Sequence, residues 1–166
     1  MIAEFDPLRA LRVLLEHGVR FVVIGGIAGR AWGSPTITND LDLCYERSIQ
    51  NREALARALV SLGATLRGAP EELPFILDAR TIGLGDSFTF ETSAGPLDCL
   101  GIPSGTAGYK DLASRATEVE LAVDLRVLIA SLDDVIRMKR AADRAKDRIE
   151  VEILEAVKRR REDTGL

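Results

Sequence analysis

The spacing of apolar residues along the chain predicts alternating helices and strands. Residues 7–17 carry leucines at helical spacing, after a good N-cap residue, Asp6, and a proline, Pro7, that suits the first helical position. Residues 50–62 show a second helical pattern, which ends at Gly63. Short β-branched or alternating runs predict strands at residues 21–24, 75–81, 87–92, 97–100, 117–121 and 125–130.

Two helices are expected to close the chain, over residues 132–143 and 146–162, with Ser131 as the N-cap of the first. The pattern therefore predicts an α/β (α+β) chain. Residues 1–130 would form a core with a small mixed sheet flanked by helices, and residues 131–166 a helical segment packed on that core. The apolar stripes expected to be buried in the first and last helices are Leu8, Leu11, Leu14 and Leu15, and Ile149, Ile153, Ala156 and Val157.

Composition narrows the class of protein. The chain has 166 residues, of which 46% are hydrophobic, and a net charge of −4, which argues against a general nucleic-acid-binding surface. A local basic run, Lys158–Arg161, is left open as a contact for RNA or another acidic partner. We expect no membrane span and no signal peptide. The two cysteines, Cys44 and Cys99, suggest packed free thiols in a cytoplasmic protein.

The stretch from Val22 to Leu43 holds the clearest candidate chemistry. A buried strand ends at Gly25 and Gly26, and a short helix is expected over residues 27–32. A strand, a glycine turn and a helix N-terminus present free N–H groups, which favour an anion such as a phosphate. The ordinary alternative is a simple turn.

Acidic residues follow on strand positions. Asp40 and Asp42 would share one face of a strand because alternate residues point the same way, while Leu41 and Leu43 point into the core. Two close carboxylates must be solvated or bound to a cation, and oxygen ligands of this kind suit Mg²⁺. Asp98 lies inside a later apolar strand, either as a partly exposed strand end or as a third metal ligand.

In this order the pattern resembles a known family. Two glycines, thirteen residues and then Asp-x-Asp resemble the signature of the polymerase-beta-type nucleotidyltransferase superfamily. The stretch is most similar to small bacterial nucleotidyltransferases of the AbiEii abortive-infection toxin type. The resemblance implies a nucleotidyltransferase-like fold, with Gly25 and Gly26 holding a triphosphate. It also implies that Asp40, Asp42 and Asp98 bind two catalytic Mg²⁺ ions, with Asp98 as the candidate base.

The C-terminal part extends the resemblance. Lys139 and the Lys146-Asp147 pair are similar to tail residues that close over the nucleotide, which implies phosphate or nucleotide contacts for all three. The alternative is a solvated charged face at i, i+4 spacing. The chain departs from the family at Thr36, where an arginine often follows the turn proline. Arg30 would replace that charge only if its helix faced the site.

The resemblance implies transfer of a nucleoside monophosphate from an NTP to a hydroxyl, with tRNA or protein as the acceptor. A role in a toxin–antitoxin pair, with a cognate toxin or antitoxin as partner, is part of this expectation. One alternative is an inactive nucleotide-binding or regulatory module similar to an antitoxin. Another is an antibiotic-modifying nucleotidyltransferase, for which we expect a larger second domain than this chain offers.

Overall fold

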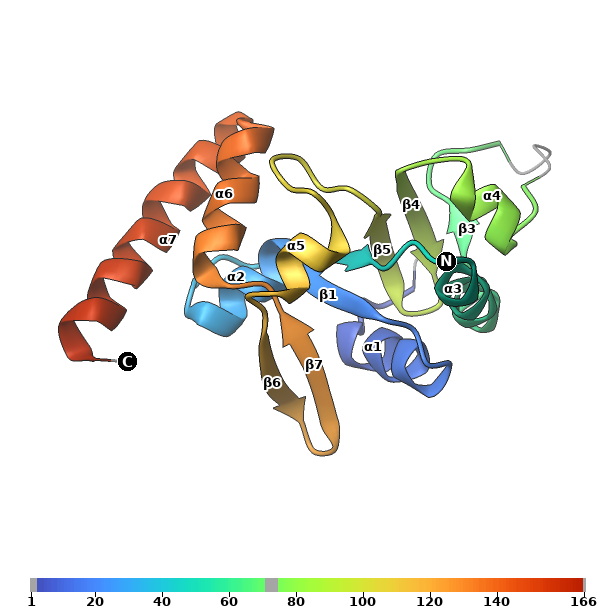
Figure 1. The fold of residues 1–166 in the computed structure, drawn as a ribbon, viewed down its shortest axis with the longest axis horizontal. Coiled ribbons are helices and arrows are strands. Elements are labelled where there is room, and N and C mark those ends of the chain that lie inside the picture. Colours follow the sequence, from blue (N-terminus) through green and yellow to red (C-terminus); the bar gives the residue numbers. More distant parts are fainter. Residues whose placement is uncertain (1–2, 71–74, 166) are drawn as a thin grey trace.

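The computed structural model describes residues 3–70 and 75–165, which form seven helices and a seven-stranded sheet (Figure 1). The strands are β1 (Phe21–Ile24), β2 (Leu41–Tyr45), β3 (Thr65–Leu66), β4 (Ser87–Thr92), β5 (Gly95–Leu100), β6 (Thr117–Ala122) and β7 (Leu125–Ile129). The helices are α1 (Pro7–Glu16), α2 (Gly25–Trp32), α3 (Ile49–Ser61), α4 (Ala79–Gly83), α5 (Tyr109–Ala113), α6 (Leu132–Ala142) and α7 (Ala145–Thr164).

The sheet is mixed, with strand order β3-β4-β5-β2-β1-β7-β6. Strand β2 runs parallel to β5 and antiparallel to β1, while β1 runs parallel to β7. The remaining pairs, β3–β4, β4–β5 and β6–β7, are antiparallel. The predicted fold class, a mixed sheet flanked by helices with a helical C-terminal segment, is confirmed. The sequence pattern missed β3, which contributes only two residues.

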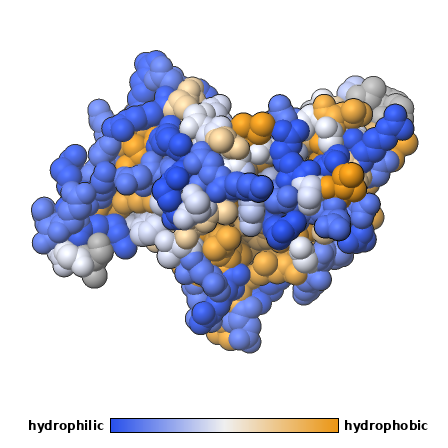
Figure 2. Space-filling model, viewed as in Figure 1, coloured by the Kyte–Doolittle hydropathy of each residue, from blue (hydrophilic) through white to orange (hydrophobic). Residues whose placement is uncertain are grey.

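The core is built from the central strands and the helices that cover them. All four residues of β1 are buried, and in β2 only Asp42 is partly exposed while Leu41 and Leu43 are buried, as predicted. Helices α6 and α7 lie side by side at one end of the molecule, where their outward face is mainly hydrophilic (Figures 1 and 2). None of the described helices combines the length and apolar character that a membrane crossing requires.

Several helix ends are confirmed in atomic detail. The Asp6 carboxylate accepts a hydrogen bond from the backbone N–H of Arg9, and Ser131 caps α6 through the N–H of Asp134. Gly18 follows α1 with φ near +73°, the left-handed conformation expected after a helix C-terminus.

Other predictions are wrong. The strand expected at residues 75–81 is absent, because the Asp78 carboxylate caps a short helix, α4, by accepting from the N–H of Thr81. The loop expected at residues 67–74 lies partly outside the described residues. In α1, Leu8 and Leu15 remain 38% exposed.

The buried stripe of α7 is also shifted from its expected position. Ile149 is 63% exposed, and the helix instead buries Asp147, Glu150 and Leu154. A pattern that counts only apolar residues cannot find this face, because two of its three buried members are carboxylates.

Candidate active site

Three carboxylates meet at the carboxyl-terminal side of β1, at the centre of the sheet. Asp42 on β2 lies directly beside Asp98 on β5 in the parallel register, and Asp40 immediately precedes β2. Each of the three offers a ligand oxygen, and these oxygens lie within 4.8 Å of one another. The hydroxyl of Thr38 donates to Asp40 Oδ1 at 3.2 Å, which fixes that side chain. The structure therefore brings together the three residues that were predicted as metal ligands.

The electrostatics of this cluster favour a cation. Burial raises the pKa of Asp42 to about 8, and the carboxylates of Asp40 and Asp98 add to the rise, while Lys139 opposes it. Asp98 is held by Arg67, whose Nη2 lies 3.0 Å from Asp98 Oδ1. Oxygen-only donors at this spacing match the ligand preference of Mg²⁺, so the donor set fits the metal that the resemblance implies.

The two glycines lie inside the first turn of α2, which begins two residues earlier than predicted. Gly25 has φ near +66°, and a Cβ on it would lie 2.9 Å from Cβ of Asp42 and closer still to its carboxylate. A Cβ on Gly26 would lie 2.7 Å from Cβ of Thr38. The close approach that we expected for a ligand is thus made by two side chains of the protein, which lets the helix N-terminus abut the carboxylates.

Two adjoining pockets open around the carboxylates. The first, of about 220 Å³, is called the cationic pocket. Besides the three carboxylates, its charged residues are Lys139, Arg144, Lys146, Asp147 and Glu150. The second, of about 300 Å³, is called the apolar pocket, and its apolar side chains are Ile24, Leu100, Pro103, Val135, Met138 and Ala142. Asp42 and Asp98 line both pockets, whereas Asp40 and Gly26 line only the cationic pocket and Gly25 only the apolar one.

A buried carboxylate organises the cations of this site. Asp147 is fully buried and accepts from the backbone N–H of Arg144 and from its side-chain Nε at 2.6 Å. Lys139 Nζ lies 3.6 Å from Asp147 Oδ1. These contacts lower the pKa of Asp147 against the effect of burial. Asp147 therefore faces its own cations and also lines both pockets, and Lys139 and Lys146 line the cationic pocket. Contact of these three residues with a nucleotide stays a prediction.

Arg144 is the site residue that the sequence analysis did not single out. It lines both pockets, and Asp147 holds it by two nitrogen–oxygen contacts of its side chain. The hydrogen bond to Asp147 raises the pKa of this guanidinium, and the negative charges of Asp42 and Asp40 add to the rise. The signal was present in the Arg144-x-Lys146-Asp147 pattern, but only the turn between α6 and α7 shows where the arginine points.

The departure at Thr36 now has a structural description. Its hydroxyl donates to Glu150 Oε2 at 2.7 Å, and Ser34 donates to the other oxygen of the same carboxylate. Arg30 donates to the carbonyl oxygens of Pro35 and Thr36 and lines neither pocket. Arg30 therefore does not replace the missing charge.

Cys44 shares the sheet face of Asp42 but is buried, and its thiol lies 3.7 Å from the carbonyl oxygen of Gly101. Burial raises the pKa of this thiol to about 12. Cys99 is likewise buried with a free thiol. Both cysteines are packed free thiols, as predicted, and neither lines the two pockets.

Comparison with known proteins gives a fold but no sequence family. No family model matches the chain, and no curated protein matches it. The lincosamide antibiotic adenylyltransferase LnuA, solved with lincomycin bound, matches with a TM-score of 0.63 at 12% identity, over 94% of this chain and 98% of that chain. The solution structure of the antibiotic-resistance factor ANT(2'')-Ia matches with a TM-score of 0.52 at 15% identity, over 95% of this chain and 94% of that chain. The crystal structure of ANT(2'')-Ia in complex with adenylyl-2''-tobramycin matches with a TM-score of 0.55 at 19% identity, over 90% of this chain and 88% of that chain.

These matches confirm the resemblance at the level of fold. The chain has the nucleotidyltransferase fold, whereas a similarity specific to AbiEii stays a prediction. The match also corrects one expectation: LnuA, whose structure holds lincomycin, is covered over 98% of its length. A larger second domain is therefore not required for such an acceptor.

Proposed function

We propose that this chain transfers a nucleoside monophosphate from an NTP to a hydroxyl group of a small molecule, with release of pyrophosphate. The observation that carries this proposal is the meeting of three carboxylates on adjoining strands beside a cationic pocket, in a nucleotidyltransferase fold. An acceptor oxygen forms a bond to the α-phosphorus, and the bond from that phosphorus to the oxygen that bridges to the β-phosphate breaks. The hydroxyl proton leaves to a base.

In this proposal Asp40, Asp42 and Asp98 would hold two Mg²⁺ ions, which when bound would supply positive charge that stabilises the negative charge developing on the phosphates. Asp98 also lies where it can accept the proton of the attacking hydroxyl, since it lines both pockets. Gly25 and Gly26 place the N-terminus of α2 beside these carboxylates, and its N–H groups favour a phosphate.

The cations of the α6–α7 turn serve the triphosphate. Lys139, Arg144 and Lys146 line the cationic pocket from one side, opposite the carboxylates of the sheet. Asp147 holds the first two of these side chains in place. Positioned positive charge of this kind stabilises a phosphoryl transition state because it needs no reorganisation during the reaction.

The small-molecule acceptor is supported by the two neighbours, whose structures hold lincomycin and adenylyl-2''-tobramycin. The basic run that suggested RNA is partly used inside the molecule. Lys158 pairs with Asp133 at 2.9 Å, and the guanidinium of Arg161 lies 4.8 Å from the ring centre of Trp32. Transfer to tRNA or protein, with a role in a toxin–antitoxin pair, stays a prediction that the same experiment tests.

The experiment measures NTP binding with and without Mg²⁺ by calorimetry, and then follows α-labelled NTP into small molecules, RNA or protein of a cell extract. The expected result is Mg²⁺-dependent binding and label on small molecules. Asp42→Asn should weaken Mg²⁺-dependent binding about tenfold or more, because it removes one anionic ligand. If the label appears on tRNA or protein instead, the proposal of a small-molecule acceptor is wrong. If NTP binds equally well without Mg²⁺, the metal assignment is refuted.

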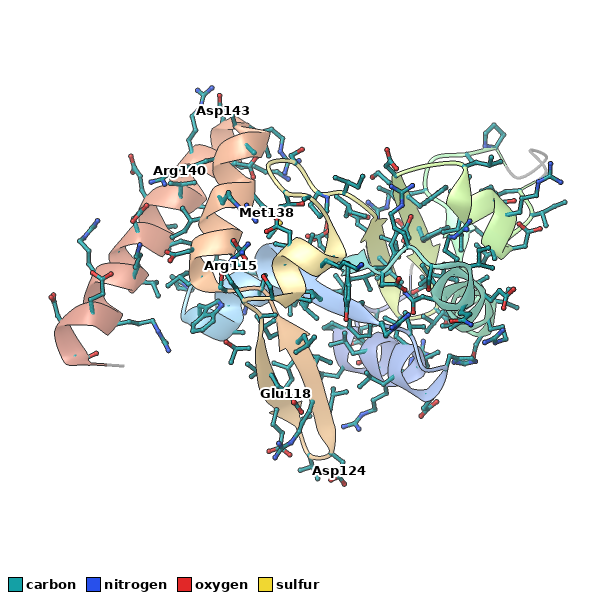
Figure 3. All side chains as sticks on the ribbon, viewed as in Figure 1. Arg115, Glu118, Asp124, Met138, Arg140 and Asp143 are labelled. Atoms are coloured by element: carbon teal, nitrogen blue, oxygen red, sulfur yellow. The ribbon has the colours of Figure 1, made fainter. Side chains whose placement is uncertain are left out.

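Asp124→Asn is the matched control. Asp124 lies at the tip of the β6–β7 hairpin, away from the site (Figure 3), and its φ of about +58° suits asparagine. The same change of carboxylate to amide should leave NTP binding and label transfer unchanged. Equal losses in Asp42→Asn and Asp124→Asn would mean that the effect is a change of net charge rather than of a ligand.

A further inference from the structure

We propose that the acceptor is a neutral or singly charged hydroxyl compound with an apolar surface, rather than a polycation, and that it binds in the apolar pocket. This inference rests on the proposed function and names the class of its acceptor. It is argued from the positions of the two pockets, from the side chains that line the apolar pocket and from the charges that are already paired there.

The geometry of the reaction assigns the pockets. The attacking oxygen and the leaving pyrophosphate lie roughly in line on opposite sides of the α-phosphorus. Lys139 and Arg144 line both pockets, but Lys146 lines only the cationic pocket, so we assign the β- and γ-phosphates to that pocket. Asp42 and Asp98 line both pockets, so an acceptor that reaches these carboxylates from outside the cationic pocket enters through the apolar pocket.

Helix α6 and the segment after β5 form two of the walls of this pocket. Helix α6 contributes Val135 and Met138, and the segment after β5 contributes Pro103 and Ser104. Met138 is half-buried and projects from α6 toward that segment (Figure 3). These side chains favour an apolar surface on the acceptor, and the hydroxyls of Ser87, Thr89 and Ser104 provide polar contacts.

The charges of the apolar pocket leave no spare anion for an amine. Among the described residues that line it, the carboxylates are Asp42, Asp98 and Asp147. The first two are the candidate metal ligands, and Asp147 is buried against Arg144 and Lys139. An acceptor with several ammonium groups would need carboxylates of its own, and it would also meet these two cations.

The rim of the pocket is braced by ion pairs. Asp111 on α5 pairs with Arg137 on α6 at 2.9 Å and with Arg115 at 2.6 Å, and it also accepts from the backbone N–H of Ala107, next to the segment that forms the wall. This connection holds α6 and the segment after β5 in a fixed relation. The pocket is therefore largely pre-formed, so its shape and polarity can select the acceptor.

The test compares acceptors in the presence of Mg²⁺ and a non-hydrolysable NTP analogue, with binding measured by calorimetry. Lincomycin and a nitrophenyl glycoside represent hydroxyl compounds with an apolar part, glucose represents the hydroxyls alone, and tobramycin represents a polycation. The expected order is lincomycin or the glycoside tightest, with glucose and tobramycin at least about tenfold weaker, since an apolar pocket discriminates by roughly this factor per apolar group. Tobramycin as the tightest ligand, or no preference for the apolar compounds over glucose, would overturn the proposal.

Variants at Met138 locate the site. Met138→Asp adds a carboxylate to the apolar wall and should weaken the apolar compounds about tenfold while tobramycin gains. Met138→Leu keeps the volume and polarity and should leave the order unchanged. In Met138→Asp the affinity for NTP should fall less than the affinity for the apolar compounds, because Met138 lines only the apolar pocket. A loss of NTP affinity in Met138→Asp, with acceptor affinity retained, would place the base of the nucleotide in this pocket and overturn the assignment.

Failure of this inference is separable from failure of the proposed function. The proposed function fails if Mg²⁺-dependent NTP binding and label transfer are absent from the wild-type chain. The acceptor class fails if NTP binds as expected but polycations are preferred, or if Met138→Asp does not change the acceptor order.

Discussion

Gly25→Ala is the substitution that most directly tests how α2 packs against the cluster of three carboxylates. The residue has φ near +66°, which costs an alanine about 1–2 kcal/mol. Its new Cβ would also lie 2.8 Å from Cγ and 2.9 Å from Cβ of Asp42. Rotating the carboxylate relieves the first contact but not the second, so strand and helix must separate, at about 1–3 kcal/mol more. The expected loss in free energy of unfolding is about 2–5 kcal/mol.

Gly63→Ala separates the two contributions. Gly63 has φ near +62°, and a Cβ on it meets nothing within 4 Å, so this variant has the same backbone strain without the collision. Denaturation by urea, followed by circular dichroism, should show Gly25→Ala to be about 1–3 kcal/mol less stable than Gly63→Ala. Mg²⁺-dependent NTP binding should fall about tenfold only in Gly25→Ala, because Asp42 is displaced. Equal stability losses, or equal NTP affinity in the two variants, would refute the role given to Gly25.

Two further outcomes follow from the ion pairs around the site. Asp147→Asn should raise the dissociation constant for NTP about tenfold, because Lys139 and Arg144 lose the carboxylate that orders them, and calorimetry would measure it; unchanged affinity would contradict this role. Asp111 accepts from the backbone N–H of Ala107 and from two arginines, which lowers its pKa to about 2. The stability that Asp111 contributes is therefore complete above pH ~4 and is lost as the pH falls through about 2. The difference in free energy of unfolding between the wild-type chain and Asp111→Asn should shrink over that range. A difference that is as large at pH 2 as at pH 7 would contradict this.

The acidic half of the site was predictable because local rules determine it. Alternation along a strand separates Asp42 from Leu41 and Leu43, and a charged residue within an apolar strand already marked Asp98. Their neighbouring positions in the sheet came from the resemblance, since parallel pairing of β2 with β5 joins segments far apart in sequence. The roles of these residues in catalysis stay predictions.

The cationic half was predictable only in part. Lys139 was named from the resemblance, but burial of Asp147 depends on how α6 and α7 pack, which no local pattern reports. The same packing buries Glu150 and exposes Ile149, the reverse of what apolar spacing favours. Arg144 was overlooked for this reason, because an arginine in a turn between two charged helices has an ordinary explanation as a solvated side chain.

The two halves face each other across the pockets, and their charges are complementary to a metal–nucleotide complex. Under the proposed function, the carboxylates on the sheet would attract the cation, and the cations at the α6–α7 turn would attract the phosphates. Burial, and then repulsion by the neighbouring carboxylates, raises the pKa of Asp42, so the acidic half is unfavourable when it is fully charged and alone. In the cationic half, Asp147 pairs with Arg144 and Lys139. A ligand that carries both charges, with the cation on one side and the phosphates on the other, neutralises both halves at once. Under the proposed function, this complementarity lets few side chains order a triphosphate, while the apolar pocket stays available to the acceptor.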